Sequence, residues 1–163
     1  MITLHGNGTV DGIANDSFRN SMPAGSVLQY KYATMTGGDA TYDSDSDADV
    51  AGMSIAIAKT KASNLVVCEI SFLPYLGGTS GMRFNLKIKR DGTEIYEAPY
   101  GVFRTSSGQV WKSSQSVLRH LDTGVNDTSS HTYKFTLKRE EGSDNTFFDA
   151  TATHTISVME VVV

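Results

Sequence analysis

A hairpin signal lies in the middle of the chain, in the stretch RFNLKIKRDGTEIYE at residues 83–97. The apolar residues of its first half occupy every second position, at Phe84, Leu86 and Ile88. In an extended chain such residues line one face of a strand. Asp91-Gly92 then supplies the two positive φ angles that a two-residue type I′ turn requires. The stretch therefore predicts two antiparallel strands with one buried face and one face in water.

The same period of two recurs along the chain. The alternating apolar sets are Leu28, Tyr30 and Tyr32; Met53, Ile55 and Ile57; and Tyr133, Phe135 and Leu137. We expect each set to face the interior and the polar residues between them to face water. The run from Leu65 to Leu73 alternates less, which predicts a central strand covered on both sides. Ser113 to Leu121 is expected to be a loop or a short strand.

These patterns predict an all-β fold: an antiparallel β-sandwich of roughly eight strands, jelly-roll-like in architecture. The first 24 residues differ, because they contain too few apolar side chains to fold alone. We therefore divide the chain into a short N-terminal arm at residues 1–24 and a β-sandwich domain at residues 25–163. The arm is expected to be mobile or to dock on another surface.

Charge and composition exclude several classes of partner. The 163 residues include 39% hydrophobic and 20% charged residues, as in ordinary globular proteins. A net charge of −4 argues against nucleic-acid binding, which requires a basic surface, and against attraction to an anionic membrane. No apolar run approaches the roughly 20 residues of a membrane-spanning helix, so no membrane insertion is expected. The start MITLHGNG lacks the features of a secretory signal, and we expect no signal peptide.

An acidic run near residue 45 is the most unusual local feature. Its alternating carboxylates, Asp43, Asp45, Asp47 and Asp49, resemble the start of a calcium loop, since Ca²⁺ binds several hard oxygens from one short segment. The match fails at the sixth position, which is Ala48 instead of Gly, and at the twelfth, which is Ser54 instead of Glu. Two readings stay open: a solvated loop, or a weak calcium site completed by another strand or subunit. We expect no other cofactor.

The remaining reactive side chains form no recognised catalytic motif. The four histidines, His5, His120, His131 and His154, lack metal-ligand spacing, and we expect them at the surface or at strand edges. Glu69 and Glu160 interrupt apolar runs and are expected to point outward or to pair with a base. Cys68 is expected to be a buried, inert thiol. No catalytic residues are assigned, and we predict that the chain is not an enzyme.

Two further features bear on partners. The aromatic residues near Gly- and Ser-rich segments, Tyr75, Tyr100, Phe103 and Trp111, could form a sugar-binding platform or pack in a core or interface. The C-terminal ISVMEVVV would aggregate as a free edge. It must therefore lie centrally in a sheet or be buried against another subunit.

Several segments resemble phage tail-fibre-like and virion decoration domains of marine and cyanobacterial phages. They are ITLHGNGTVDGI at 2–13, AGSVLQYKYATMT at 24–36, MSIAIAKTKASNLVVCEISF at 53–72, HTYKFTLKR at 131–139 and ATHTISVMEVVV at 152–163. Such domains are generally β-sandwiches that trimerise around a three-fold axis. The resemblance transfers no catalytic or ligand-binding residue.

The resemblance implies a homotrimeric virion structural protein, made in the host cytoplasm and located at the virion surface. The first hypothesis is a tail-fibre or receptor-binding-type component whose arm docks on other virion proteins of the tail or capsid, with a host surface glycan as a further candidate partner. The alternative is a capsid decoration (cement) protein that stabilises the head. A third hypothesis is a carbohydrate-binding or carbohydrate-cleaving domain on the same scaffold.

Overall fold

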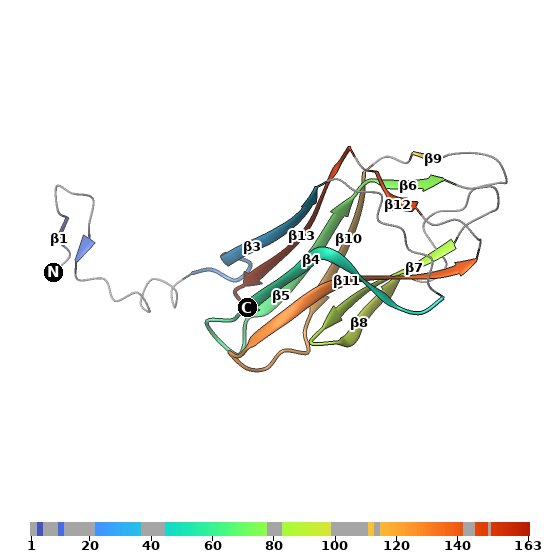
Figure 1. Cartoon of the computed structure of the whole chain (residues 1–163). Coiled ribbons are helices and arrows are strands. Elements are labelled where there is room, and N and C mark those ends of the chain that lie inside the picture. The colour runs from blue at the N-terminus through green and yellow to red at the C-terminus, as the bar shows by residue number, and fades with distance from the viewer. Residues whose placement is uncertain are drawn as a thin grey trace.

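Two antiparallel four-stranded sheets stack face to face in the computed structural model of the chain (Figure 1). The structure describes residues 3–4, 10–11, 22–36, 45–77, 83–98, 111–112, 115–141, 146–149 and 151–163. The long strands are β3 (Val27–Thr36), β4 (Ala48–Ala58), β5 (Leu65–Phe72), β7 (Arg83–Arg90), β8 (Thr93–Ala98), β10 (Ser116–Asp122), β11 (Ser130–Glu141) and β13 (Thr153–Val161). Short strands are β1 (Thr3–Leu4), β2 (Val10–Asp11), β6 (Pro74–Gly77), β9 (Trp111–Lys112) and β12 (Thr146–Phe148). These described elements include no helix, which confirms the all-β prediction.

The eight long strands pair as nested hairpins. The innermost pair, β7 and β8, is closed by Asp91-Gly92, where both residues have positive φ angles of 50° and 83°. Around it lie the pairs β5–β10, β4–β11 and β3–β13 in succession. The resulting sheet orders are β10-β5-β13-β3 and β4-β11-β7-β8. A long hairpin rolled up in this nested way is the jelly roll that the sequence predicted.

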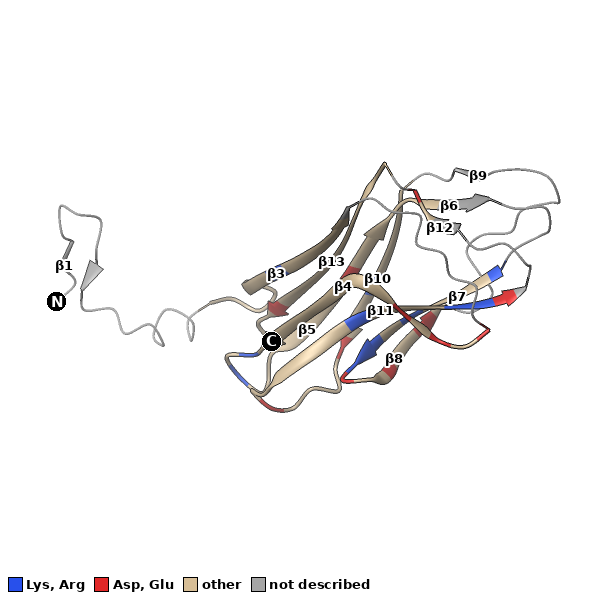
Figure 2. Ribbon diagram, viewed as in Figure 1, with Lys and Arg blue, Asp and Glu red and all other residues tan. Residues whose placement is uncertain are grey.

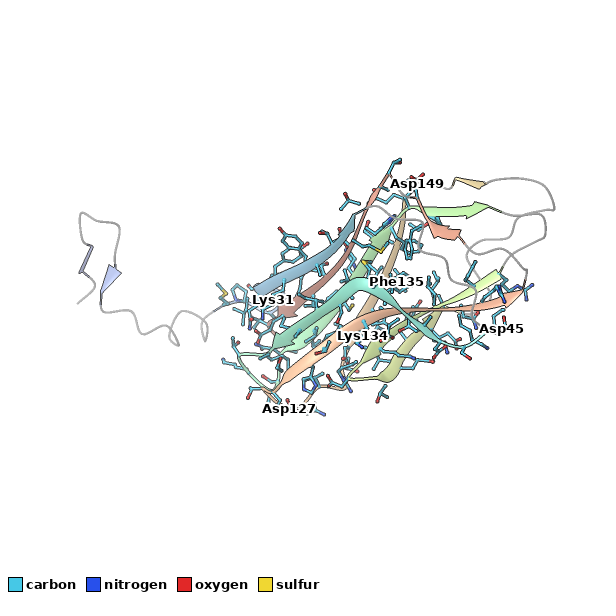
Figure 3. The ribbon with its side chains drawn as sticks, in the orientation of Figure 1. Lys31, Asp45, Asp127, Lys134, Phe135 and Asp149 are labelled. Atoms are coloured by element: carbon cyan, nitrogen blue, oxygen red, sulfur yellow. The ribbon has the colours of Figure 1, made fainter. Side chains whose placement is uncertain are left out.

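The core fills the space between the sheets. Alternate residues of β7 and β11 are fully buried there, including Leu86 and Ile88. Phe135, labelled in Figure 3, is one of them. The rings of Phe72 and Phe135 lie 5.5 Å apart, and Phe148 meets Phe135 edge-on at 6.2 Å. Each such side chain contributes about 1.5–3 kcal/mol by leaving water. The predicted inward sets of these two strands are confirmed.

Strand β3 has the opposite orientation to the one predicted. Tyr30 and Tyr32 are 57% and 62% exposed, and they point away from the core. Gln29 and Lys31 lie on the other side of the strand and reach the neighbouring edge strand β4; Gln29 is half-buried, whereas Lys31 is exposed. There Gln29 Nε2 donates to the Ala58 carbonyl at 2.9 Å, and Lys31 Nζ donates to the Ala56 carbonyl at 3.3 Å. The alternation along β3 was predicted correctly, but its direction was not. β3 and β4 are edge strands of different sheets, and the polar side chains of β3 bind carbonyl groups of β4 where the two edges meet.

Three expectations about single strands are now settled. β13 lies centrally in its sheet, between β5 and β3, which is the first of the two positions expected for the C-terminal segment. Residues 116–121 of the segment 113–121 belong to β10, as the short-strand alternative predicted. In β5, Cys68 is fully buried as expected, and burial raises the pKa of its thiol to about 12. The prediction that β5 is covered on both sides is wrong for this chain, because Leu65 and Val67 are only half-buried on the outer side of the sheet.

The start of the sandwich is joined to the chain's last residues. Gly25 N–H donates to the Val162 carbonyl at 2.8 Å, and Val162 N–H donates to the Ser26 carbonyl at 2.9 Å. Within the predicted arm the structure describes the β1–β2 pair and residues 22–24 only. Docking of the arm therefore stays a prediction. In the described part of the chain, no helix is long and apolar enough to cross a membrane.

Candidate functional site

Charged residues gather on the strands of the sheet β4-β11-β7-β8 (Figure 2). Their side chains form a lattice of ion pairs on the outer face of this sheet, which we call the charged face. Its paired side chains are Asp45, Asp47, Asp49, Lys87, Lys89, Glu94, Glu97, Lys134, Lys138, Arg139 and Glu140. Lys87 Nζ lies 3.1 Å from Asp47 and 2.9 Å from Glu94. Lys89 Nζ lies 2.8 Å from Asp47. Ion pairs at a protein surface contribute about 0–1 kcal/mol each, so the main effect of the lattice is that nearly every charge on this face has a partner of opposite sign.

The acidic run joins this lattice. Its candidate calcium ligands were Asp43, Asp45, Asp47 and Asp49, of which Asp43 lies outside the described residues. Asp45 lies 3.0 Å from Arg139 Nη2 (Figure 3), and Asp49 lies 2.7 Å from Lys134 Nζ. The hydrogen bond from Lys134 holds the pKa of Asp49 below its usual value. Among the residues that the structure describes, no three metal-ligating side chains gather, and the calcium site stays a prediction.

The outer face of the other sheet is different in kind, and we call it the apolar face. Its outward side chains are Val27, Tyr30, Tyr32, Thr34, Leu65, Val67, Glu69, Ser71, Val117, Arg119, Leu121, Thr155, Ser157, Met159 and Val161. One cross-strand row runs through all four strands, from Tyr30 through Met159 and Val67 to Leu121. Leu121 is 47% exposed at the β10 end of this row. Because large contiguous apolar patches on protein surfaces are often interaction sites, this row makes the apolar face the candidate functional surface.

One ion pair lies within the apolar face. Arg119 Nε donates to Glu69 Oε2 at 2.7 Å, and Arg119 Nη2 donates to the same oxygen. The two residues are cross-strand partners on β10 and β5. The expectation that Glu69 points outward or pairs with a base is confirmed. The pair leaves the face without net charge.

Glu160 was expected to point outward or to pair with a base, and this is wrong. Its side chain is fully buried, and its carboxylate accepts hydrogen bonds from Asn64, Gln29 and both donors of Thr60, at 2.6–2.7 Å. Burial opposes ionisation of Glu160, but these hydrogen bonds outweigh it and hold the pKa below its usual value. The carboxylate therefore fastens the last strand to the β4–β5 connection.

Lys59, in that connection, is a second buried charge, and nothing in the local sequence signals it. Its Nζ donates to three backbone carbonyls, those of Ala62, Asn64 and Val125, each at 2.6 Å. Burial lowers its pKa. The carbonyls of Ala62 and Asn64 lie in the same connection as Lys59, whereas Val125 is 66 residues away, so only the tertiary structure brings this third acceptor to the lysine.

Asp122 forms the third buried polar centre. It accepts two hydrogen bonds from Arg90 Nη1, at 2.7 and 2.6 Å, one from Tyr133 Oη at 2.7 Å and one from the Gly124 N–H at 2.9 Å. Burial raises its pKa, but these donors outweigh it, so the net pKa lies below the usual value. The group ties β10 to β7 and β11. Its carboxylate is fully engaged as an acceptor, which suits a structural role.

The histidines occupy unlike environments. His131 lies at the surface between Asp91, at 2.6 Å, and Asp127, at 2.9 Å, and these hydrogen bonds raise its pKa. His154 is buried, so its expected surface position is wrong. Its ring accepts the Leu73 N–H at Nδ1, and Nε2 lies 3.1 Å from the Asp149 carbonyl. Burial lowers its pKa. His120 packs against Tyr96 with ring centroids 5.2 Å apart, and His5 lies outside the described residues.

The proposed aromatic platform lies outside the residues whose side chains are described. Its members were Tyr75, Tyr100, Phe103 and Trp111. The exposed aromatic pair that the structure does place is Tyr30 and Tyr32, with ring centroids 6.0 Å apart. Sequence reasoning assigned this pair to the core. The signal against that assignment was the pair of polar residues on either side of Tyr30, Gln29 and Lys31, whose long side chains can equally reach a neighbouring edge strand.

Comparison with known proteins gives structural likeness only. No protein-family model and no curated protein sequence matches the chain. The fold is similar to part of dimeric latent PorU from Porphyromonas gingivalis, with 10% identity over 85% of this chain and 14% of that chain, at a TM-score of 0.45. It is also similar to part of the VP2 subviral particle protein of infectious bursal disease virus, with 12% identity over 85% and 39% of the two chains, at a TM-score of 0.42. The chain thus spans well under half of either structure, and these likenesses assign it no activity or partner.

Proposed function

We propose that this chain is a structural protein of a bacteriophage particle, a trimeric tail-fibre or receptor-binding-type component at the virion surface. The observation that carries the proposal is the contrast between the two outer faces of the jelly roll. One face carries charged side chains that are joined in ion pairs, whereas the other exposes Tyr30, Tyr32 and Leu121. A sandwich with one such face is suited to assembly, because covering it removes apolar surface from water. The sequence resemblance to phage fibre and decoration domains supports the same assignment.

The proposal gives the chain no catalytic role. A catalytic acid or base needs a free lone pair or proton directed at a substrate. The buried carboxylates of Asp122 and Glu160 instead accept several hydrogen bonds from the chain itself. Both groups stabilise connections between strands, and this supports a structural role.

Attachment to the particle is assigned to the N-terminal arm, residues 1–24. In the proposal this segment docks on tail or capsid proteins while the sandwich faces outward, and a host surface glycan is the candidate external ligand. Neither nucleic acid nor insertion into a membrane enters the proposal, in keeping with the net charge of −4.

Gold labelling of purified phage particles with an antibody against the chain tests the proposal. Label on the tail, together with blocked adsorption to host cells, is the expected result. Label on the head would replace the fibre assignment with a decoration protein, whose loss should make heads less resistant to heat. No label on particles would overturn the virion assignment. Shortening of a purified host polysaccharide by the chain would overturn the non-catalytic role.

A further inference from the structure

The apolar face presents its largest exposed side chains at its two edges. Tyr30 and Tyr32 lie on the edge strand β3, and Leu121 and Val117 lie on the opposite edge strand β10. Between them, Met159 and Val67 are half-buried and continue the row. Tyr and Met are enriched in the buried centres of protein interfaces. The row therefore has the composition of an interface centre and spans the full width of the sheet.

The charges of this face restrict what can cover it. Of its outward side chains, only Glu69 and Arg119 are ionised, and they bind each other. A strongly charged partner would therefore find no complementary charge here. A second copy of the same face is also neutral overall. The Arg119 side chain is 66% exposed in a single copy, so that it can also pair with Glu69 of the second copy. Two copies can thus meet without burying an unpaired charge.

The size of the face limits the area that one contact can bury. Four strands about 4.8 Å apart and four rows about 7 Å apart span roughly 15 by 20 Å, or about 300 Å² in plan. A standard stable interface buries about 800 Å² on each partner. One face-to-face contact is therefore at the weak end, and we expect association that is reversible and depends on concentration.

We infer that the apolar face of the sheet β10-β5-β13-β3 is the contact surface on which a second copy of this chain packs. The inference rests on the self-assembly in the proposed function and adds a contact to it: two identical faces meet with two-fold symmetry, so this contact pairs copies and is separate from the contacts around the proposed three-fold axis. The row of Tyr30, Met159, Val67 and Leu121 lies at the centre of that contact, and the charged face remains in water.

Sedimentation velocity of the full chain over a wide range of concentration tests this inference. The variants Tyr30→Glu and Leu121→Glu each place a carboxylate within the row. The matched control is Ala56→Glu, which makes the same kind of change at an exposed position of β4 in the other sheet. The wild type and control should associate toward a multiple of 17.6 kDa. Each face variant should raise the dissociation constant by about 100-fold or more, because the contact would bury unpaired carboxylates.

The other outcomes separate the two claims. A wild type that stays monomeric at every concentration would overturn both the self-assembly and this inference, and would leave the face to a different protein. Association that is unchanged in both face variants would overturn the inference alone and leave self-assembly intact.

A thiol-labelling measurement covers the case in which a face variant misfolds. In Tyr30→Cys the introduced thiol is the reactive one, since Cys68 is fully buried. Its reaction with a maleimide should slow as the protein is concentrated into the associated range. An equal labelling rate in the dilute and the associated protein would overturn the inference.

Discussion

The carboxylate of Glu160 and the side-chain amide of Asn64 form a 2.6 Å hydrogen bond across 96 residues of sequence. The bond joins the last strand, β13, to the connection between β4 and β5. Thr60 donates to the same carboxylate oxygen through its N–H and its hydroxyl, both at 2.7 Å. One buried oxygen thus organises the turn of a connection that contributes no large apolar side chain to the core.

Glu160→Gln should destabilise the fold by about 2–4 kcal/mol, because the new amide group presents N–H donors to the donors that now bind the carboxylate. Urea unfolding followed by circular dichroism measures the change. Glu140→Gln is the control, because Glu140 is exposed on the charged face and its replacement should cost less than about 1 kcal/mol. Equal unfolding midpoints for the two variants would contradict the role of Glu160.

Lys59→Met should cost about 2–4 kcal/mol, although it replaces a buried charge with an apolar side chain of similar length. The substitution leaves the carbonyls of Ala62, Asn64 and Val125 without their shared donor. Lys61→Met, two residues away at an exposed position, is the matched control and should be nearly neutral. A Lys59→Met protein as stable as the wild type would mean that these carbonyls find other donors.

The sequence predicted those parts of the fold that depend on local pattern. Alternation at Phe84, Leu86 and Ile88 identified a strand and its buried face. The prediction succeeded because β7 lies inside its sheet, between β11 and β8, so that only the side of the strand with these three residues faces the core. Asp91-Gly92 identified the innermost turn, because few residue pairs adopt two positive φ angles. Repeated alternation and turn signals of this kind were sufficient to predict an antiparallel β-sandwich.

What the sequence could not supply depends on tertiary contacts. Alternation at Tyr30 and Tyr32 defines two faces of β3 but does not say which one faces the core. In the structure, Gln29 and Lys31 lie on the core side, where they donate hydrogen bonds to carbonyl groups of β4. Likewise, Glu160 in an apolar run is an anomaly whose donors come from residues far away in sequence. The apolar face could therefore not be predicted from the sequence, because its residues come from four strands whose order in the sheet is a tertiary feature.

His131 should make stability fall as pH rises above about 6.5. The hydrogen bonds to Asp91 and Asp127 raise its pKa, so the folded protein holds this proton more tightly than the unfolded chain. The contribution of His131 to the free energy of unfolding is complete below 6.5, the ordinary pKa of histidine, and is lost as pH rises through the raised pKa of the folded protein. His131→Gln should flatten this limb of the curve of urea midpoint against pH. Parallel curves for the variant and the wild type would exclude the effect.

His154 should act in the opposite direction, on the acid side. Burial lowers its pKa, and a proton on Nδ1 would displace the hydrogen bond from Leu73 N–H. As pH falls below 6.5, the unfolded chain takes up a proton that the folded protein resists, and stability is lost down to the lowered pKa. Unfolding midpoints between about pH 5 and 7 should decline toward acid in the wild type and less steeply in His154→Gln. An equally steep decline in the variant would assign the acid limb to other groups.

The central claim is that this chain is a structural component of phage particles, and counting its copies in purified particles by quantitative mass spectrometry tests it most directly. The expected result is a fixed number of copies per particle, divisible by three and resistant to washing in high salt. Absence of the chain from washed particles, with the protein remaining in the lysate, would contradict the claim.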